Sequence, residues 1–148
     1  MRKVNVLGRP CVVKMRIAKS YRVRELDEKL RAERTRSEAR LLHKAKLAGL
    51  LCPKVLEVDD FVITMGFIEG GRPEMTAEQC REAGEMLAKL HAAGIIHGDY
   101  TPANLIACKT GGRLYVIDFG LGFISDDVED KAVDVFTMLR ALGESGDD

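Results

Sequence analysis

Runs of apolar residues near the N-terminus predict a β-hairpin followed by a long helix. Residues 4–7 and 11–15 have the composition of two short strands, and Gly8-Arg9-Pro10 between them is typical of a turn. A long helix is expected over about residues 25–50. Gly49 marks its end, because glycine commonly follows the last turn of a helix. The first third of the chain is therefore predicted to pair one hairpin with one helix.

A second hairpin and a glycine-rich break follow this helix. Residues 55–58 and 61–67 are rich in β-branched and aromatic side chains and flank a turn at Asp59-Asp60. The segment 69–73 contains two adjacent glycines and a proline, which predicts a hinge-like break.

Helical spacing dominates the second half of the chain. Thr76 and Gln79 form a capping box, in which each side chain can satisfy a free backbone N–H at a helix start. Apolar residues then recur at helical spacing until Gly94, where the helix should end. The remaining predicted elements are a third hairpin and a last helix: residues 105–107 and 114–117 around Gly111-Gly112, then residues 128–142.

This order of elements predicts an α+β fold with two lobes in a single domain over residues 1–148. Residues 1–69 would form a minimal N-terminal lobe of one sheet and one helix, and residues 70–148 a small, mainly helical lobe. The boundary falls near Gly70-Gly71, and a cleft between lobes commonly holds a ligand.

Composition describes a globular protein. Of 148 residues, 46% are hydrophobic and 31% are charged, which excludes a disordered or fibrous chain. No apolar run approaches the roughly 18 residues needed to span a bilayer, so we expect a soluble, cytoplasmic protein without a membrane partner. The four cysteines lack metal-ligand spacing and are expected to be free thiols.

The net charge of zero hides a strong asymmetry between the two halves. Residues 1–54 hold 16 Lys and Arg against 5 Asp and Glu, a net charge of +11, whereas residues 55–148 hold 7 against 18, a net charge of −11. Two explanations stay open: an electrostatic contact between the halves, or a basic face for an anionic partner such as nucleic acid.

The most informative pattern lies in the second half. His97-Gly98-Asp99, with Asn104 five residues after the aspartate, precedes Asp118-Phe119-Gly120, and together they match the phosphoryl-transfer pattern H-x-D-x-x-x-x-N…D-F-G. Asn104 and Asp118 offer the oxygen ligands that Mg²⁺ prefers, and Asp99 can accept or orient the proton of an attacking hydroxyl or water.

A lysine and a glutamate in the first half complete this pattern. Lys14 ends a β-like run, and Glu38 shares a helix face with apolar Leu41, Leu42 and Ala45. Because a carboxylate on an apolar stripe is costly unless it is paired, we expect Glu38 to pair with Lys14 and to direct its ammonium at the phosphates of ATP.

Several neighbouring residues are assigned supporting roles. The lobe connection Met65-Gly66-Phe67-Ile68 can offer backbone groups to an adenine edge. His91 is expected in the core, whereas His97 and Asp134 are expected to brace the catalytic loop. Gly98 replaces the arginine of the usual H-R-D, and no A-P-E follows, which argues against a phosphorylated switch loop.

The chain resembles the atypical serine/threonine kinases of the KEOPS complex (the PRPK type). The segments that carry this resemblance cover nearly the whole chain: 13–16, 19–22, 26–31, 34–40, 96–99, 117–122 and 129–134. Compared with that family, the chain is expected to be short at both ends, before Lys14 and after the last helix.

The resemblance implies a Mg²⁺-dependent, ATP-binding protein kinase or ATPase that supports threonylcarbamoyladenosine formation on tRNA. Its implied partners are the threonylcarbamoyl transferase and other KEOPS subunits, with a tRNA contact through the basic first half. The family roles carried over are Lys14 on phosphates, Glu38 as its partner, Asp99 as catalytic base, and Asn104 and Asp118 on Mg²⁺.

Two other functions remain open at this point. One is a non-catalytic, kinase-shaped adaptor that binds a protein or tRNA, with tRNA affinity dependent on Arg16, Lys19 and Arg22. The other is a small-molecule phosphotransferase, because aminoglycoside-type enzymes share an H-G-D…N loop.

Overall fold

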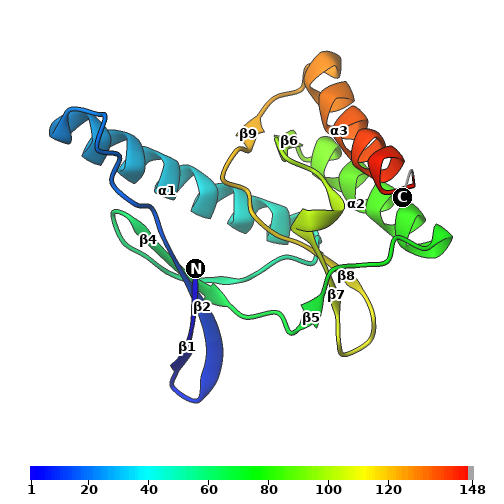
Figure 1. Cartoon of the computed structure of the whole chain (residues 1–148), viewed down its shortest axis with the longest axis horizontal. Coiled ribbons are helices and arrows are strands. Elements are labelled where there is room, and N and C mark those ends of the chain that lie inside the picture. The colour runs from blue at the N-terminus through cyan, green and yellow to red at the C-terminus, as the bar shows by residue number, and fades with distance from the viewer. Residues whose placement is uncertain (147–148) are drawn as a thin grey trace.

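The computed structural model describes residues 1–146. The first half is built around the larger sheet and one long helix, and the second half is mainly helical (Figure 1). The first half holds a four-stranded antiparallel sheet, and helix α1 (Arg24–Leu47) packs against its strands β3 and β4. In spatial order the strands are β1 (Arg2–Val6), β2 (Arg9–Met15), β4 (Val62–Gly66) and β3 (Val55–Val58). The two hairpins predicted for this half are thus confirmed, and β2 and β4 join them into one sheet.

Helix α1 presents a narrow buried face that includes two charged residues, Asp27 and Glu38. Leu41, Leu42 and Ala45 are buried on this face together with Glu38. The helix ends a few residues before the predicted position because Gly49 adopts φ +91°, and the Leu50 N–H donates to the carbonyl of Ala45.

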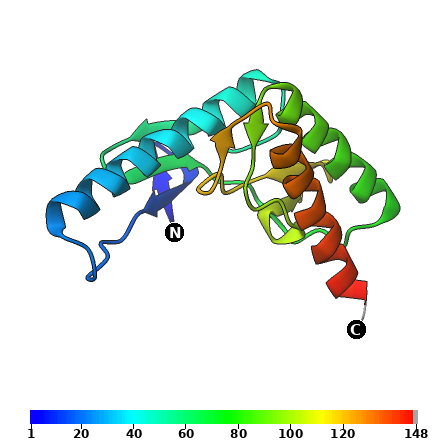
Figure 2. The ribbon, with the colours of Figure 1, turned by 90° about the horizontal axis from the view of Figure 1, so that it is seen from above.

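The second half consists of two helices and short strands. Helix α2 (Ala77–Ala92) begins with the predicted capping box of Thr76 and Gln79, and helix α3 (Val128–Gly146) lies nearby (Figures 1 and 2). A three-stranded sheet and a two-residue ladder complete the half: β5 (Gly70–Gly71), β7 (Leu105–Cys108) and β8 (Leu114–Val116), then β6 (Ile95–Ile96) with β9 (Phe123–Ile124). No helix in the described part of the chain has the length and apolar character to cross a membrane.

The glycine-rich segment differs from the predicted hinge-like break. Gly70 and Gly71 pair with Cys108 and Ala107 as strand β5. A Cβ atom at Gly70 would lie 2.1 Å from the carbonyl oxygen of Ala107, so only glycine allows this close pairing. The segment is therefore part of the second half's sheet.

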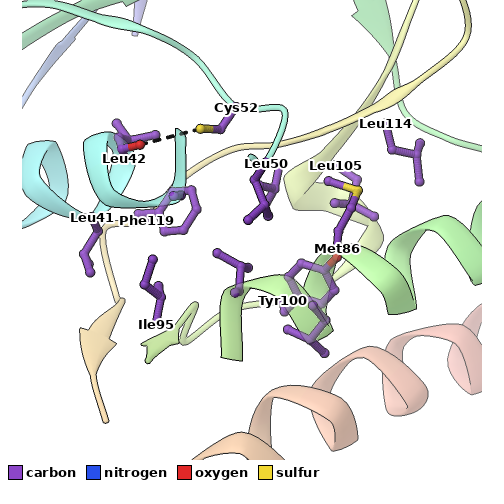
Figure 3. Packing of buried hydrophobic residues seen from close by; sticks show 14 of the residues in the cluster. Leu41, Leu42, Leu50, Cys52, Met86, Ile95, Tyr100, Leu105, Leu114 and Phe119 are labelled. Carbon is purple, nitrogen blue, oxygen red and sulfur yellow. Dashed lines mark hydrogen bonds between the residues drawn. The ribbon is translucent and has the colours of Figure 1, made fainter. Parts of the chain in front are cut away.

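One hydrophobic core runs through both halves. Figure 3 shows Leu41 and Leu42 of α1 beside Phe119, with Leu50 between them and the residues of the second half. The buried cluster also includes Ile63 of β4 and Leu105 of β7. Because these residues come from both sides of the boundary, the core fixes the position of α1 relative to the second half.

Candidate active site

A cleft of about 420 Å³ lies where the two halves meet. Side chains from β2, α1, β4 and the segments around β7 and β8 line it, so it exists only in the folded chain. Eight residues predicted from the sequence to bind nucleotide or metal line this cleft: Lys14, Glu38, Met65, Gly66, Phe67, Ile68, Asn104 and Asp118.

The Lys14 ammonium lies between two carboxylates. Its Nζ donates to Glu38 Oε1 at 2.5 Å and to Asp118 Oδ1 at 3.1 Å. Strand β2 supplies Lys14, α1 supplies Glu38, and Asp118 follows β8, so three elements distant in sequence meet at one cation. The Lys14–Glu38 pair predicted from the helix face is present in the structure.

Asp118 is held in an uncommon backbone conformation and in its ionised form. Its φ is +59°, which a non-glycine residue adopts rarely and mostly where the surrounding structure imposes it. Burial raises the pKa of the Asp118 carboxyl, but the Lys14 ammonium and the Gly120 N–H outweigh burial, so the pKa lies below its ordinary value of 3.8. Asp118 is therefore a carboxylate at neutral pH.

The hairpin of β7 and β8 brings Asn104 and Asp118 to the same end. Asn104 directly precedes β7, Asp118 comes shortly after β8, and the Ile117 N–H donates to the Asn104 carbonyl at 2.9 Å. The Asn104 Nδ2 donates to Asp99 Oδ2 at 3.0 Å and to the Asp99 carbonyl at 2.8 Å. Asp99 is thus fixed beside Asn104, although it is outside the set of residues that line the cleft.

The oxygens that these bonds leave available fit a magnesium ion. The Asn104 amide donates through its nitrogen, and Asp118 accepts through Oδ1, so Asn104 Oδ1 and Asp118 Oδ2 are available as ligands. Within residues 1–146, no group of three or more His, Cys, Asp or Glu side chains could hold a metal alone. Such a sparse set suits Mg²⁺, which commonly takes one or two protein oxygens together with phosphate oxygens and water.

His97 and Asp134 brace the loop that carries Asp99. Asp134 accepts from the backbone N–H groups of His97 and Gly98 at 2.8 and 3.0 Å, and it also contacts His91 Nε2 at 2.9 Å. The Asp99 N–H donates to His97 Nδ1, which leaves Nε2 to donate to the Ile117 carbonyl. Burial lowers the pKa of His97 despite the nearby acids, so the ring is neutral.

Gly98 has a steric reason to replace the arginine of H-R-D. Its φ is +86°, and a Cβ atom there would lie 2.2 Å from the carbonyl oxygen of Leu121. The loop before Asp99 and the segment after Asp118 therefore approach too closely for any side chain at this position.

Sequence analysis missed the apolar walls of the cleft. Val12, Leu42, Ile106 and Ile117 line it beside the predicted polar residues. Three of them are close in sequence to a predicted residue, since Val12 and Ile106 lie two positions from Lys14 and Asn104, and Ile117 precedes Asp118. Alternation was the signal that could have identified Val12 and Ile106, each two positions from a predicted residue, whereas it does not reach Ile117, which is adjacent to Asp118.

Sequence analysis also missed a second cation on Glu38. Arg16 lies two residues beyond Lys14 on the same side of the chain, and one terminal nitrogen lies 3.6 Å from Glu38 Oε2. The same guanidinium lies beside Gly120, so it borders the segment that carries Asp118.

Comparison with known proteins places this site in a family. The family model of the RIO domain matches residues 12–129. This range includes five of the predicted site residues: Lys14, Glu38, Asp99, Asn104 and Asp118. The chain belongs to the RIO-domain family.

Curated relatives of this RIO domain include a kinase homologue and a KEOPS complex subunit. A probable serine/threonine-protein kinase BUD32 homolog of Archaeoglobus fulgidus is 46% identical over 136 residues, covering 90% of the chain and 69% of that protein. The KEOPS complex subunit Bud32 of Pyrococcus abyssi is 44% identical over 142 residues, covering 88% and 64%. The resemblance to KEOPS-type kinases predicted from the sequence is confirmed.

A longer relative contains a region similar to this RIO domain. The probable bifunctional tRNA threonylcarbamoyladenosine biosynthesis protein of Methanothermobacter thermautotrophicus is 46% identical over 142 residues. The match covers 92% of the chain and 26% of that protein, so the chain spans about a quarter of its length.

Solved structures confirm the kinase-like α+β fold of the RIO domain. The Rio2 kinase from Chaetomium thermophilum superposes with a TM-score of 0.77 at 16% identity, covering 93% of this chain and 51% of that one. Its ADP/Mg²⁺-phosphoaspartate complex gives a TM-score of 0.74 at 17% identity, covering 93% and 50%.

Proposed function

We propose that the chain binds Mg·ATP in the cleft between its halves and transfers or hydrolyses the γ-phosphoryl group. One observation carries this proposal: Lys14 Nζ contacts both Glu38 and Asp118 at a cleft that Asn104 also lines. Phosphoryl transfer needs positioning and neutralisation of charge more than covalent chemistry, and these groups supply both.

Each residue has a distinct role in the proposed reaction. Lys14 would bind the α- and β-phosphates while Glu38 holds its ammonium in place, and Asn104 and Asp118 would hold Mg²⁺. Mg²⁺ neutralises charge on the phosphates when it is bound. Asp99, fixed by Asn104, would accept or orient the proton of the attacking hydroxyl or water.

The lobe connection would receive the adenine ring. The N–H groups of Gly66 and Phe67 donate to the carbonyls of Lys54 and Pro10, at 2.9 and 3.2 Å. We therefore expect carbonyl groups of the connection and the Ile68 N–H to face the base, between apolar walls that include Val12 and Ile106.

We further propose that this activity supports threonylcarbamoyladenosine formation on tRNA within a KEOPS complex. Relatives at 44% and 46% identity carry names from that process. The partners would be the threonylcarbamoyl transferase and other KEOPS subunits, and a tRNA contact and a cytoplasmic location stay predictions from the sequence.

Replacement of the proposed metal ligand tests the reaction. Asp118→Asn should abolish Mg·ATP turnover, because a neutral amide lacks the negative charge with which the carboxylate holds Mg²⁺, while circular dichroism stays unchanged. Asp60→Asn, in the exposed β3–β4 turn, is the matched control and should keep full turnover. Unchanged turnover in Asp118→Asn would refute the assignment.

A calorimetric titration with Mg·ATP separates this function from its alternatives. A non-catalytic adaptor would bind partner protein or tRNA without saturable Mg·ATP binding. Phosphate transfer to an amino sugar or alcohol, with none to protein, would indicate a small-molecule phosphotransferase instead.

A further inference from the structure

A second hollow lies next to the nucleotide cleft and is strongly basic. It measures about 260 Å³ and is enclosed by the end of β2, the segment that leads into α1, and the first turns of α1. Six cationic side chains line it: Lys14, Arg16, Lys19, Arg22, Arg31 and Arg34. Lys14 lines both cavities, so the hollow adjoins the end of the cleft where phosphates are expected.

The acids around this hollow do not balance its cations. Asp27 forms ion pairs with Arg31 at 2.6 Å and with Arg22 at 3.4 Å. Glu38 and Asp118 both form ion pairs with Lys14. Three carboxylates thus face six cations.

Two of the six cations are left without any side-chain partner. In the part of the chain that the structure describes, the side chains of Lys19 and Arg34 make no ion pair or hydrogen bond. Nor do the acidic residues after position 54 neutralise the basic residues 1–54, since among the described residues the ion pair that links these two segments is Lys14–Asp118.

Arg16 is only partly matched within the chain. One buried terminal nitrogen faces Glu38 Oε2 at the long distance of 3.6 Å, and its buried Nε has no hydrogen-bond acceptor among the described residues. Buried guanidinium nitrogens normally have acceptors, so Arg16 adds an under-compensated positive charge at the wall of the hollow.

We propose that this hollow binds a phosphate monoester, the phosphorylated serine or threonine side chain of a protein partner. The cations come from β2, the following segment and α1, and they converge on a single hollow. A monoester carries a charge of about −1.5 to −2, which suits several converging guanidinium groups. A nucleic-acid backbone would instead favour cations spread along a groove.

The location gives the site a consequence for the proposed reaction. A phosphate bound here lies beside Lys14, so a partner that already carries one phosphate would be held at the phosphate end of the cleft. This consequence rests on the proposed function, whereas the binding itself is measurable without nucleotide.

Peptide binding to the full chain without nucleotide tests the site. The probe is a short Ala/Gly peptide with one phosphoserine, measured by fluorescence anisotropy against its unphosphorylated form. We expect the phosphopeptide to bind roughly tenfold tighter or more, because hydrogen bonds to charged groups are strong. Arg16→Gln and Arg34→Gln should each lose about tenfold in affinity.

Matched controls keep the test falsifiable. Arg24→Gln removes an equal charge at the start of α1, outside the hollow, and should leave the affinity unchanged. Arg34 is exposed, so its substitution should preserve the fold even where Arg16→Gln unfolds.

Three outcomes would overturn the proposal. They are equal binding of the two peptides, an equal loss in Arg24→Gln, and displacement of the phosphopeptide by a short RNA of higher affinity. The last result would make the hollow a nucleic-acid site. None of them concerns the turnover measured with Asp118→Asn, so the two proposals fail independently.

Discussion

At the scale of single residues, the charge on Glu38 organises the site. Its side chain is 2% exposed and accepts from Lys14, with Arg16 beside its second oxygen. A carboxylate in such a position is tolerated only when cations compensate for the lost hydration. The same pairing that stabilises Glu38 therefore directs Lys14 into the cleft.

Removal of this carboxylate should cost both stability and activity. We expect Glu38→Ala to lower the free energy of unfolding by about 2 kcal/mol, because Lys14 and Arg16 lose their shared partner but keep some solvent contact. Urea unfolding measures the loss, and ATP turnover should fall in parallel. Glu33→Ala, exposed on the same helix, should change neither quantity. Equal effects in the two variants would contradict the assigned role.

His97 should make stability depend on pH. Because burial holds its folded-state pKa below the ordinary value of 6.5, the unfolded chain binds a proton that the folded chain does not. Its contribution to stability is therefore complete above pH 6.5 and is lost as the pH falls toward the folded-state pKa.

Urea unfolding at about pH 7.5 and about pH 5.5 measures this effect. The loss of stability at the lower pH should shrink in His97→Gln and persist in His43→Gln, a variant of an exposed histidine on α1. A loss of equal size in all three proteins would assign the pH dependence to other groups.

At the scale of elements, close backbone approaches set where glycine is required. Gly70 of β5 lies against Ala107 of β7, and Gly98 lies against Leu121, so both backbone approaches are too close for a side chain. By contrast, the helix starts are set locally, as the Thr76–Gln79 capping box at α2 illustrates.

Adjacent glycines in β5 should respond differently to a single methyl group. Gly70→Ala should destabilise the fold by roughly 1–3 kcal/mol, because the methyl would overlap the Ala107 carbonyl and force β5 from β7. Gly71→Ala has open space around its Cβ and should leave stability nearly unchanged. Thermal unfolding compares the two, and equal midpoints would show that β5 does not pair with β7 as described.

At the scale of the whole molecule, one core unites the two halves. Leu42 on α1 and Phe119 after β8 belong to the same buried cluster, which Figure 3 shows side by side. The cleft proposed to bind nucleotide lies over this shared core, so its walls depend on packing from both halves.

Truncation of a core residue on α1 should therefore weaken the second half too. We expect Leu42→Ala to lower the free energy of unfolding by about 2–5 kcal/mol. Amide hydrogen exchange should accelerate in β7 and α2 as well as in α1. Leu47→Ala, on the same helix but 76% exposed, is the control and should have little effect. Faster exchange confined to the first half would show that the halves unfold separately.

The sequence by itself determined the local elements and the chemistry of the site. Apolar spacing, turn residues and the capping box predict the three hairpins and the three α-helices, because these signals act between near neighbours. The spacing of His97, Asp99, Asn104 and Asp118 predicts phosphoryl transfer for the same reason, since one loop and one hairpin carry these residues.

Only the tertiary structure decided which distant residues meet. The ladder of β6 with β9 and the pairing of β5 involve two residues each, too few for any periodicity to reveal. Arg16 carries no local sign that it borders Glu38, because that contact requires β2 to lie beside β4 and α1 to pack against the sheet. The basic hollow follows from the same packing, which depends on the whole fold and not on neighbours in sequence.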